Sequence, residues 1–497
     1  MVSESLFANA LKSKGCSIEF ILCDEILPAC VVSMIETCDE KKMLNGKISN
    51  LCATCFSRAK KNIDSMGFKT HKFSKYIDKE QVRSINLMNF DDFSFKDIIN
   101  YEIDSIKVGQ HAYSATLRYY GVGDLDVEKN SKKILIKYLK ASIISKIVFE
   151  NFFNTEKYDH ILINSGLYVP QGILTEIAGN KGIFTTTWEF AYKKFGYFFS
   201  KNQTFHTAAF LEPNSNWENI DMNQAIHTRI DDYLKSRWEG NQDRKIFIQK
   251  PDYEISKFFE LNNFDTSKPI IGLATNLIWD AKVYYEDSFL DSLEWVDYTI
   301  KYFLKRKDLN LVIRIHPAEV LKDKPSRQRM DLEIKKKFKN LPDNILVVPP
   351  DNPISTYKLF EYCNSVITYC TKMGVELTAT GMPVIVCGNG PIRNKKIAID
   401  VSSEEEYKKV LDNLPLKEKI KGSKLERAKK YAYHFFFRKT IQVKSLYEKK
   451  NKYPSIGIKN SLFENLKNKE EFINYLKNFF SSWFSQPIKI RLHFYNG

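Results

Sequence analysis

The second half of the chain alternates short apolar runs with longer segments in which apolar residues recur every three or four positions. The apolar runs predict buried strands, and the periodic segments predict amphipathic helices. Because strands that are apolar on both faces are typical of parallel sheets, this half predicts a doubly wound α/β domain. The expected strands are 269–275, 309–315, 344–348, 365–369, 383–387 and 397–401, and the expected helices are 292–305, 330–338, 356–362, 375–380 and 404–414.

The first half shows the same alternation with less regularity. Its expected elements are strands at 18–23, 158–164 and 182–187 and one long helix at 131–153. Residues 244–266 are expected to connect the two halves. The pattern therefore predicts two Rossmann-like domains, residues 1–245 and 246–430, with a cleft between them. Ligands of such domains bind beyond the carboxyl ends of the strands.

The last part of the 497-residue chain is basic and aromatic. From residue 416 to residue 497 there are 19 Lys and Arg against 6 Asp and Glu, which accounts for most of the net charge of +15. Residues 431–497 are expected to form a basic helical extension, with 472–484 as an amphipathic helix. This extension indicates an anionic surface partner, and the alternative is a solvated lysine-rich face.

Three roles are open for this extension. The first role is docking of the protein on the inner membrane surface, the second is packing of the extension back across the first domain, and the third is binding of nucleic acid. Nucleic acid is not expected, because no recognised binding motif accompanies the charge. The sequence shows no signal peptide and no apolar stretch of about 20 residues that would span a membrane. We therefore expect a cytoplasmic protein, peripheral at the inner membrane if the extension docks there.

Six of the nine cysteines fall within the first 55 residues. Four of these six cysteines include one CxxC pair and suit a structural zinc ion. The alternative is that the thiols are reduced and bind no metal, with Cys23 buried in the core. The expected zinc ligands are Cys23, Cys30, Cys52 and Cys55. The three later cysteines lie in apolar, strand-like runs and are expected to be small buried hydrophobic residues. They are Cys363, Cys370 and Cys387.

The strongest chemical signal is the segment 371–383, which follows an expected strand. It places Glu376 five residues before Gly381 and seven before Pro383, directly ahead of another strand. A helix that begins here offers unpaired N–H groups and a positive dipole end, which suit a phosphate. Lys372 adds a full charge, and Glu376 is placed to accept hydrogen bonds from ribose hydroxyls. The alternative is that Glu376 is only an acidic residue in the first turn of a helix and that Gly381 only ends this helix. The expected nucleotide-binding residues of this segment are Thr371, Lys372, Gly374 and Glu376.

A second signal is a strand that ends in a His-Pro turn. Pro317 forces the chain out of strand pairing and leaves His316 at the carboxyl end, where ligands bind. At that position His316 hydrogen-bonds a phosphate or the leaving-group oxygen, and the alternative is a capping or core histidine. Arg314, two residues earlier, points into the same cleft or into a salt bridge.

Further polar residues are expected at the same edge of the sheet. Asn276, Trp279 and Asp280 follow the first strand of the second domain, and Trp279 stacks on a sugar ring or anchors the rim. Arg393 and Lys395 follow a later strand. They are expected to bind a donor phosphate or a sugar carboxylate, with a solvated basic loop as the alternative.

These motifs resemble the capsule polysaccharide biosynthesis family, a bacterial group of GT-B-like proteins that includes transferases for the acidic sugar Kdo. The matching stretches are 275–281, 314–319, 355–357, 371–376, 393–395 and 431–438, with 164–172 and the cysteine-rich start in the first half. The resemblance implies the GT-B fold, surface-polysaccharide assembly and a nucleotide-sugar donor that is CMP-, UDP- or GDP-linked. In the related enzymes the histidine and glutamate of these motifs contact the donor, which implies that role for His316 and Glu376.

The catalytic base is expected from the first domain, because the acceptor of a GT-B enzyme enters from that side. Asp24 and Glu25 follow the first strand, and Glu189 follows a later one. Each is placed to deprotonate an acceptor hydroxyl, or is an ordinary helix-start acid. Asp24 and Glu25 rank slightly ahead of Glu189.

The sequence therefore predicts a glycosyltransferase that moves a sugar from a nucleotide donor to a growing capsular or other surface polysaccharide, or to a glycolipid. No catalytic cofactor is expected if the helix dipole and basic residues neutralise the phosphate. The alternatives are a non-hydrolysing sugar-nucleotide epimerase, a CDP-polyol phosphotransferase, and a non-catalytic scaffold in capsule assembly.

Overall fold

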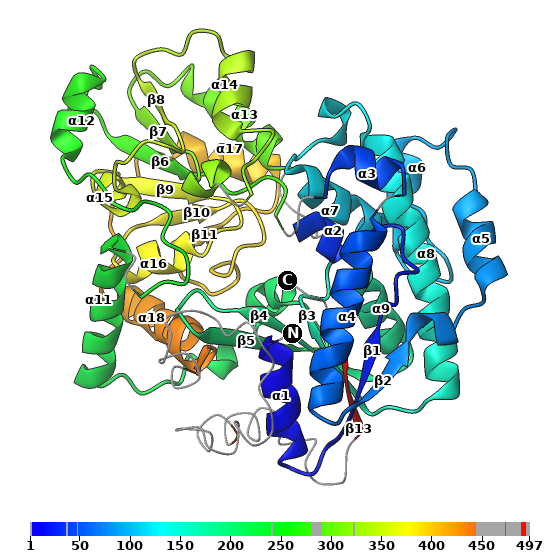
Figure 1. The fold of residues 1–497 in the computed structure, drawn as a ribbon. Coiled ribbons are helices and arrows are strands. Elements are labelled where there is room, and N and C mark those ends of the chain that lie inside the picture. Colours follow the sequence, from blue (N-terminus) through cyan, green and yellow to red (C-terminus); the bar gives the residue numbers. More distant parts are fainter. Residues whose placement is uncertain are drawn as a thin grey trace.

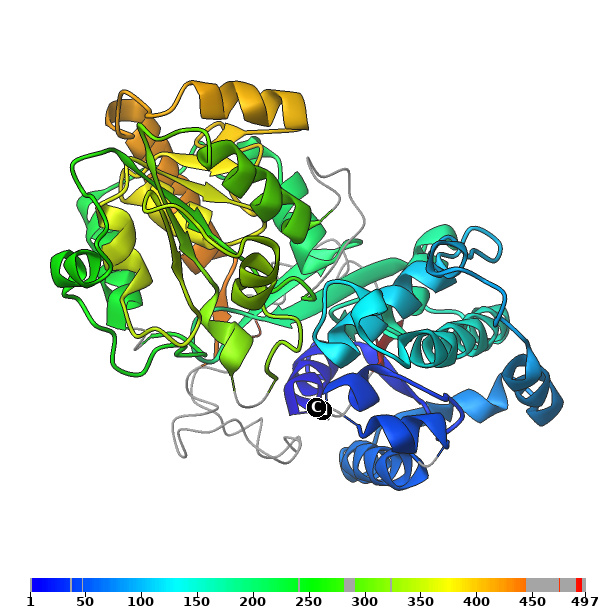
Figure 2. The same ribbon diagram turned by 90° about the horizontal axis from the view of Figure 1, so that it is seen from above.

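The computed structural model describes residues 2–35, 38–46, 48–239, 242–280, 291–321, 324–443, 473 and 489–493. These residues form two β-sheets, each covered by helices (Figure 1). Figure 2 shows the two sheets in neighbouring halves of the molecule. The chain is therefore an α/β protein with two sheet-centred halves, as its apolar pattern predicts.

The sheet of the second half has six parallel strands in the order β11-β10-β9-β6-β7-β8. Every residue of β6, β7 and β9 is buried, which confirms the prediction of strands covered on both faces. The strand order reverses between β6 and β9, and open α/β sheets bind ligands at such a switch point. The strands are β6 Ile270–Ala274, β7 Asn310–Arg314, β8 Ile345–Val348, β9 Ser365–Thr368, β10 Val384–Val386 and β11 Ile399–Asp400.

Polar caps set where several helices of the second half begin. The side chain of Asp291 accepts hydrogen bonds from the N–H groups of Leu293 and Glu294, and Ser355 and Ser403 cap their helices in the same way. The helices are α12 Ile255–Leu261, α13 Ser292–Phe303, α14 Met330–Lys337, α15 Thr356–Glu361, α16 Met373–Ala379 and α17 Glu404–Asp412. From α13 onward these bounds lie within a few residues of the predicted helices.

The sheet of the first half has seven strands in the order β12-β5-β4-β3-β13-β1-β2. The five strands from β4 to β2 are parallel, whereas β5 pairs antiparallel with β4 and β12 pairs antiparallel with β5. This sheet is therefore mixed, because a tight connection returns the chain beside β4 without a covering helix. The strands are β1 Ser17–Leu22, β2 Lys69–Lys72, β3 His160–Asn164, β4 Phe184–Phe190, β5 Gly196–Lys201, β12 Ile441–Gln442 and β13 Lys489–His493.

Two long helices, α7 and α8, pack against each other on the first sheet. Helix α8 is the long helix that the apolar periodicity predicts, and most of its residues are buried. The helices are α1 Val2–Lys12, α2 Val31–Ile35, α3 Glu40–Leu44, α4 Ser49–Ser65, α5 Lys79–Leu87, α6 Phe95–Ile99, α7 Val108–Tyr120, α8 Ser131–Thr155, α9 Gln171–Asn180, α10 Phe205–Leu211 and α11 Gln224–Glu239.

The C-terminal part of the chain returns to the first half. Helix α18, Gly422–Tyr433, packs on α16 and α11, and strands β12 and β13 join the first sheet. Strand β13 lies between β1 and β3, and its backbone pairs with both (Figure 1). The segment predicted as a helical extension thus contributes a central strand. The amphipathic helix expected at 472–484 lies outside the described residues except for Ile473, and no described helix is long and apolar enough to cross a membrane.

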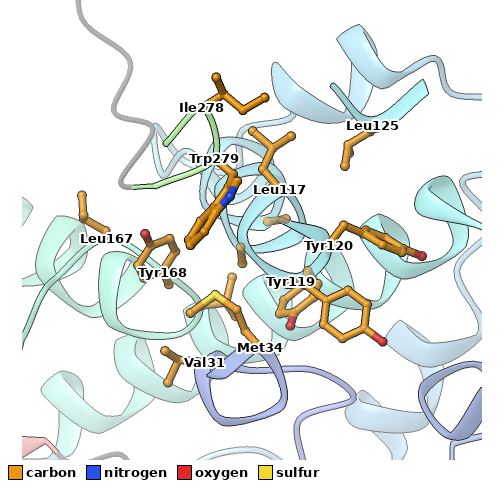
Figure 3. Packing of buried hydrophobic residues seen from close by; sticks show 14 of the residues in the cluster. Val31, Met34, Leu117, Tyr119, Tyr120, Leu125, Leu167, Tyr168, Ile278 and Trp279 are labelled. Carbon is orange, nitrogen blue, oxygen red and sulfur yellow. The ribbon is translucent and has the colours of Figure 1, made fainter. Parts of the chain in front are cut away.

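A shared apolar core joins the two halves. Ile278 and Trp279 of the second half pack among Met34, Leu117 and Tyr168 of the first (Figure 3). Trp279 is 3% exposed, and its indole N–H donates to the hydroxyl of Ser326 at 2.8 Å. Trp279 is therefore a core residue of the contact between the halves rather than a platform for a sugar ring.

Candidate functional site

The switch point of the second sheet is lined by polar residues that follow β6 and β9. The side-chain oxygen of Asn276 accepts a hydrogen bond from the backbone N–H of Cys370 at 3.3 Å, which links the two diverging strand ends. Thr371 follows, and its hydroxyl accepts from the N–H of Met373 at 3.2 Å. Cys370 is exposed, so the expectation of a buried thiol is wrong at this position, whereas Cys363 and Cys387 are buried. The difference arises because Cys370 lies past the end of its strand.

Glu376 is buried in helix α16 and surrounded by three partners. Its Oε1 lies 2.7 Å from both Lys372 Nζ and Arg237 Nε, and its Oε2 accepts from the Tyr357 hydroxyl at 2.9 Å. Burial by itself would raise the pKa of Glu376, but Arg237 and Lys372 outweigh it and hold the pKa below its ordinary value. Both carboxylate oxygens therefore already have protein partners, and Glu376 positions Lys372 and Arg237.

Lys372 lies beside Tyr192 of the first half. Its Nζ is 5.1 Å from the centre of the Tyr192 ring, a cation–π contact, as well as 2.7 Å from Glu376. Burial, with Arg237 nearby, lowers the pKa of Lys372 to about 8. Lys372 thus stays largely protonated at neutral pH, and it shares the charge of Glu376 with Arg237, which also forms an ion pair with Asp243.

His316 caps the short turn after β7, and this cap fixes the position of its proton. Its Nδ1 accepts a hydrogen bond from the backbone N–H of Ala318 at 3.0 Å, so Nε2 carries the proton of the neutral ring. Burial and the charge of Lys372 lower the pKa of His316 to about 4. The ring is therefore neutral at pH 7 and offers Nε2–H as a donor.

The first half also contributes polar groups to this area. Arg118 of α7 forms an ion pair with Asp280, donates to the Tyr168 hydroxyl at 3.2 Å and lies 5.4 Å from the Trp279 ring. Burial alone would raise the pKa of Asp280, but Arg118 and His206 outweigh it and lower that pKa. Arg118 thereby holds the end of β6 against the first half.

Glu189, near the carboxyl end of β4, lies in the field of the same groups. Burial raises the pKa of its carboxyl group, and the nearby charge of Asp280 adds to the rise, while Ser165 and Arg118 oppose it. Tyr192 lies in the field of carboxylates from both halves. Burial raises the pKa of Tyr192, and the charges of Glu376, Asp280 and Glu189 add to the rise. We call this group of facing side chains the seam; it comprises Arg118, Glu189, Tyr192, His206, Asp280, His316, Lys372 and Glu376.

Arg314, expected at the donor site, has a different role. Its guanidinium donates to the Thr356 hydroxyl at 3.1 Å and to the carbonyl oxygens of Pro349 and Asn352 at 2.5 and 3.0 Å. Burial lowers the pKa of Arg314 to about 10. Because every arm of the guanidinium meets the loop between β8 and α15, Arg314 supports that loop.

Arg393, Lys395 and Gly374 also have structural contacts. Arg393 donates to the Ser402 hydroxyl at 3.0 Å, and Lys395, fully buried, donates to the carbonyl oxygens of Phe210 and Glu212 at 3.1 and 2.9 Å. Neither residue belongs to a solvated loop. A Cβ atom at Gly374 would lie 2.8 Å from the Ile392 side chain, so glycine here is required by packing.

Asp24 and Glu25 do not join the seam in this structure. Asp24 accepts hydrogen bonds from the backbone N–H of Ser74 at 3.0 Å and from its hydroxyl at 2.5 Å, which anchors the turn after β2. Glu25 lines a separate cavity beside Cys52. Of the three proposed bases, Glu189 is the one that the fold brings to the seam.

The N-terminal cysteines lie close enough for their charges to interact, since Cys30 and Cys52 each lie in the field of Cys55. Burial raises the pKa of Cys52 to about 11, so the thiol is protonated at pH 7, whereas zinc binds thiolates. Among the residues that the structure describes, no three His, Cys, Asp or Glu side chains are placed to hold a metal ion. Zinc at Cys23, Cys30, Cys52 and Cys55 stays a prediction that requires these thiols to move.

Several residues of the seam were not predicted from the sequence. Arg118 lies on a helix, where an arginine is most often solvated, and so does Arg237 beside the seam. Tyr192 and His206 lie in aromatic segments typical of a core. Their positions depend on how the halves meet, which sequence periodicity does not encode.

No family model and no curated protein matches the chain. The beta Kdo 2,4 transferase KpsC of Thermosulfurimonas dismutans is a similar solved structure, with 12% identity over 53% of this chain and 76% of that chain and a TM-score of 0.35. The beta Kdo 2,7 transferase KpsC of the same organism has 14% identity over 67% and 89%, with a TM-score of 0.34. The UDP-GlcNAc 2-epimerase of Neisseria meningitidis, bound to UDP-GlcNAc, has 10% identity over 84% and 94%, with a TM-score of 0.27. At these values the similarities assign neither a family nor an activity.

Proposed function

We propose that the protein is a glycosyltransferase of the GT-B type, with a nucleotide-sugar donor at the switch point and an acceptor on the side of the first sheet. One observation carries this proposal: a neutral histidine donor and a lysine at the carboxyl ends of β7 and β9 lie in one seam with a carboxylate from the other sheet. Open α/β sheets bind nucleotides at such an edge. The resemblance to capsule polysaccharide proteins supports a surface glycan as the product.

The donor's phosphate would lie against His316 and Lys372. As the bond between the sugar's anomeric carbon and the phosphate oxygen breaks, negative charge develops on that oxygen. Nε2–H of His316 and the ammonium of Lys372 would stabilise this charge by hydrogen bonding. Asn276 and Thr371, at the same edge, would bind the nucleotide, and Glu376 would position Lys372.

Glu189 would take the proton of the acceptor hydroxyl while the oxygen of that hydroxyl forms its bond to the anomeric carbon. A carboxylate with a raised pKa is a stronger base than an ordinary glutamate, which suits this step. Arg118 and Asp280 would hold the two halves, and hence base and donor, at a fixed separation.

Nucleotide binding is the first experiment. The purified protein is titrated calorimetrically with UDP, CMP, GDP and CDP, and the tightest ligand is then measured with His316→Ala and His316→Gln. Loss of one hydrogen bond to a charged group predicts about tenfold weaker binding for His316→Ala, with partial recovery for Gln, which keeps a donor. Failure of the parent protein to bind any of the four nucleotides would overturn the proposal.

Peripheral attachment to the inner membrane through the tail is also part of the proposal. The basic and aromatic residues concerned, including Phe479, Phe480, Trp483 and Phe484, lie outside the described residues. They are tested by replacing the four aromatic residues with serine and measuring sedimentation with anionic vesicles. Vesicle binding equal to that of the parent would contradict membrane docking.

A further inference from the structure

A cavity that is separate from the seam lies at the carboxyl end of β1. Its volume is about 510 Å³, and its walls come from the loop after β1, the segment before α4, the segment after α5 and one face of α8. Glu25 lines this cavity, but Asp24 does not. The cavity is thus a feature of the first half alone.

Helix α8 presents three lysines to this cavity. Lys133, Lys137 and Lys140 are spaced by four and three residues, so they share one face of the helix. Most of the remaining surface of α8 is buried in the core, which confines the positive charge to this face. Three ammonium groups therefore converge on one wall.

The protein neutralises the charge of these lysines only in part, because Asp91 acts on Lys140. Within the described part of the chain, no carboxylate forms an ion pair with any of the three, and Lys140 donates to the backbone carbonyl of Asn86 at 2.7 Å. Burial and the neighbouring charge of Lys140 lower the pKa of Lys137. Three lysines and two carboxylates, Glu25 and Asp91, line the cavity, and this excess of positive charge favours the binding of an anion.

The other walls suit the rest of a saccharide. Ile26, Leu27 and Ile136 provide apolar surface against which the C–H face of a sugar ring packs. Glu25 and Asp91 also line the cavity, and their carboxylates can accept hydrogen bonds from hydroxyl groups while repelling a second anion. The combination favours a ligand with one anionic group and several hydroxyls.

We propose that this cavity binds a saccharide through one carboxylate or phosphate group held by Lys133 and Lys137. That this saccharide belongs to the acceptor rests on the glycosyl transfer proposed above, whereas anion binding does not. The proposal gives Glu25 a role in ligand recognition in place of the catalytic role expected from its position in the sequence.

The full-length protein is titrated with glucuronate, glucose 6-phosphate and glucose at low ionic strength. Both anionic sugars are expected to bind at least tenfold more tightly than glucose, and this preference should fall about tenfold in Lys133→Gln/Lys137→Gln. Neither substitution removes a hydrogen bond between described residues. Lys335→Gln/Lys336→Gln, on the exposed face of α14, makes the same change in net charge and should bind as the parent does.

The outcomes separate this proposal from the nucleotide site. Binding of only one anionic sugar identifies the group as carboxylate or phosphate. Equal binding of all three sugars, or equal loss in both double variants, would overturn the proposal. Nucleotide affinity is measured in the same variants: Lys133→Gln/Lys137→Gln should keep it, so failure at the cavity and failure at the seam are read independently.

Discussion

Lys372 and Glu376 form an ion pair one helical turn apart, with Nζ 2.7 Å from Oε1, beside Tyr192 of the other half. The carboxylate is shared with Arg237, which forms a second ion pair with Asp243, so the group holds two cations and two carboxylates. Lys372 is thereby held at the edge of the second sheet with Glu376 as its ion-pair partner.

Nucleotide affinity should depend on pH through Lys372. Its pKa of about 8 means that the ammonium is present below pH 8 and is lost as the pH rises through that value. Binding of the preferred nucleotide should therefore weaken several-fold between pH 7 and pH 9. The Lys372→Arg variant keeps its positive charge throughout this range, so its nucleotide affinity should not change with pH. Parallel calorimetric pH profiles for the two proteins would contradict a role for Lys372.

Glu376 should be important for stability as well as for binding. Glu376→Ala leaves Lys372 buried without its anion and removes one of the two carboxylate partners of Arg237, which predicts a loss of about 3–5 kcal/mol in the free energy of unfolding. Glu376→Gln keeps the hydrogen bond with Tyr357 and should cost less. Denaturant unfolding measures both variants.

The pH dependence of stability provides a second test of Glu376. Its pKa in the folded protein is below the ordinary value of 4.5, so its contribution is fully present above that pH and is lost as the pH falls through the folded pKa. The parent should lose stability below about pH 4.5 more steeply than Glu376→Gln. Identical acid profiles would show that the ion pair contributes little.

Glu189→Gln should abolish transfer but not donor binding. The amide keeps the size of the side chain but accepts no proton, which predicts a loss of about 10²–10⁴-fold in kcat. In the parent the raised pKa of Glu189 should place the acidic limb of the pH–rate profile above that of an ordinary glutamate. Asp24→Asn serves as the matched control and should retain activity.

A product formed from donor alone, with no acceptor, would instead favour the epimerase alternative.

Removing β13 should unfold the first half. A chain that ends at residue 488 lacks the strand between β1 and β3, whereas a chain that ends at residue 493 keeps it. The first should lose the cooperative unfolding transition of the first half, and the second should unfold as the full chain does. Circular dichroism during thermal unfolding distinguishes them. Equal transitions would mean that β13 is dispensable.

The fold of the second half was predictable because its strands are almost continuously apolar and its helices begin at clear caps. The first half was harder to predict, because nothing in the sequence near β1 or β3 indicates that β13 lies between them. In addition, β5 runs antiparallel to β4. At the candidate site, the positions of His316 and Glu189 at strand ends were predictable from the apolar runs before them. Arg314 and Lys395 also lie at or after strand ends, but their long side chains donate to carbonyl oxygens of neighbouring segments, and only tertiary packing decides this.

Because Ser17 of β1 pairs with Lys489 of β13, the N-terminal sheet cannot close until residues 489–493 have left the ribosome. Until then β1 and β3 have open edges that invite pairing with other chains, a hazard that grows with the time spent waiting. Production of the protein should therefore benefit from slow synthesis at low temperature and from chaperones that cover strand edges.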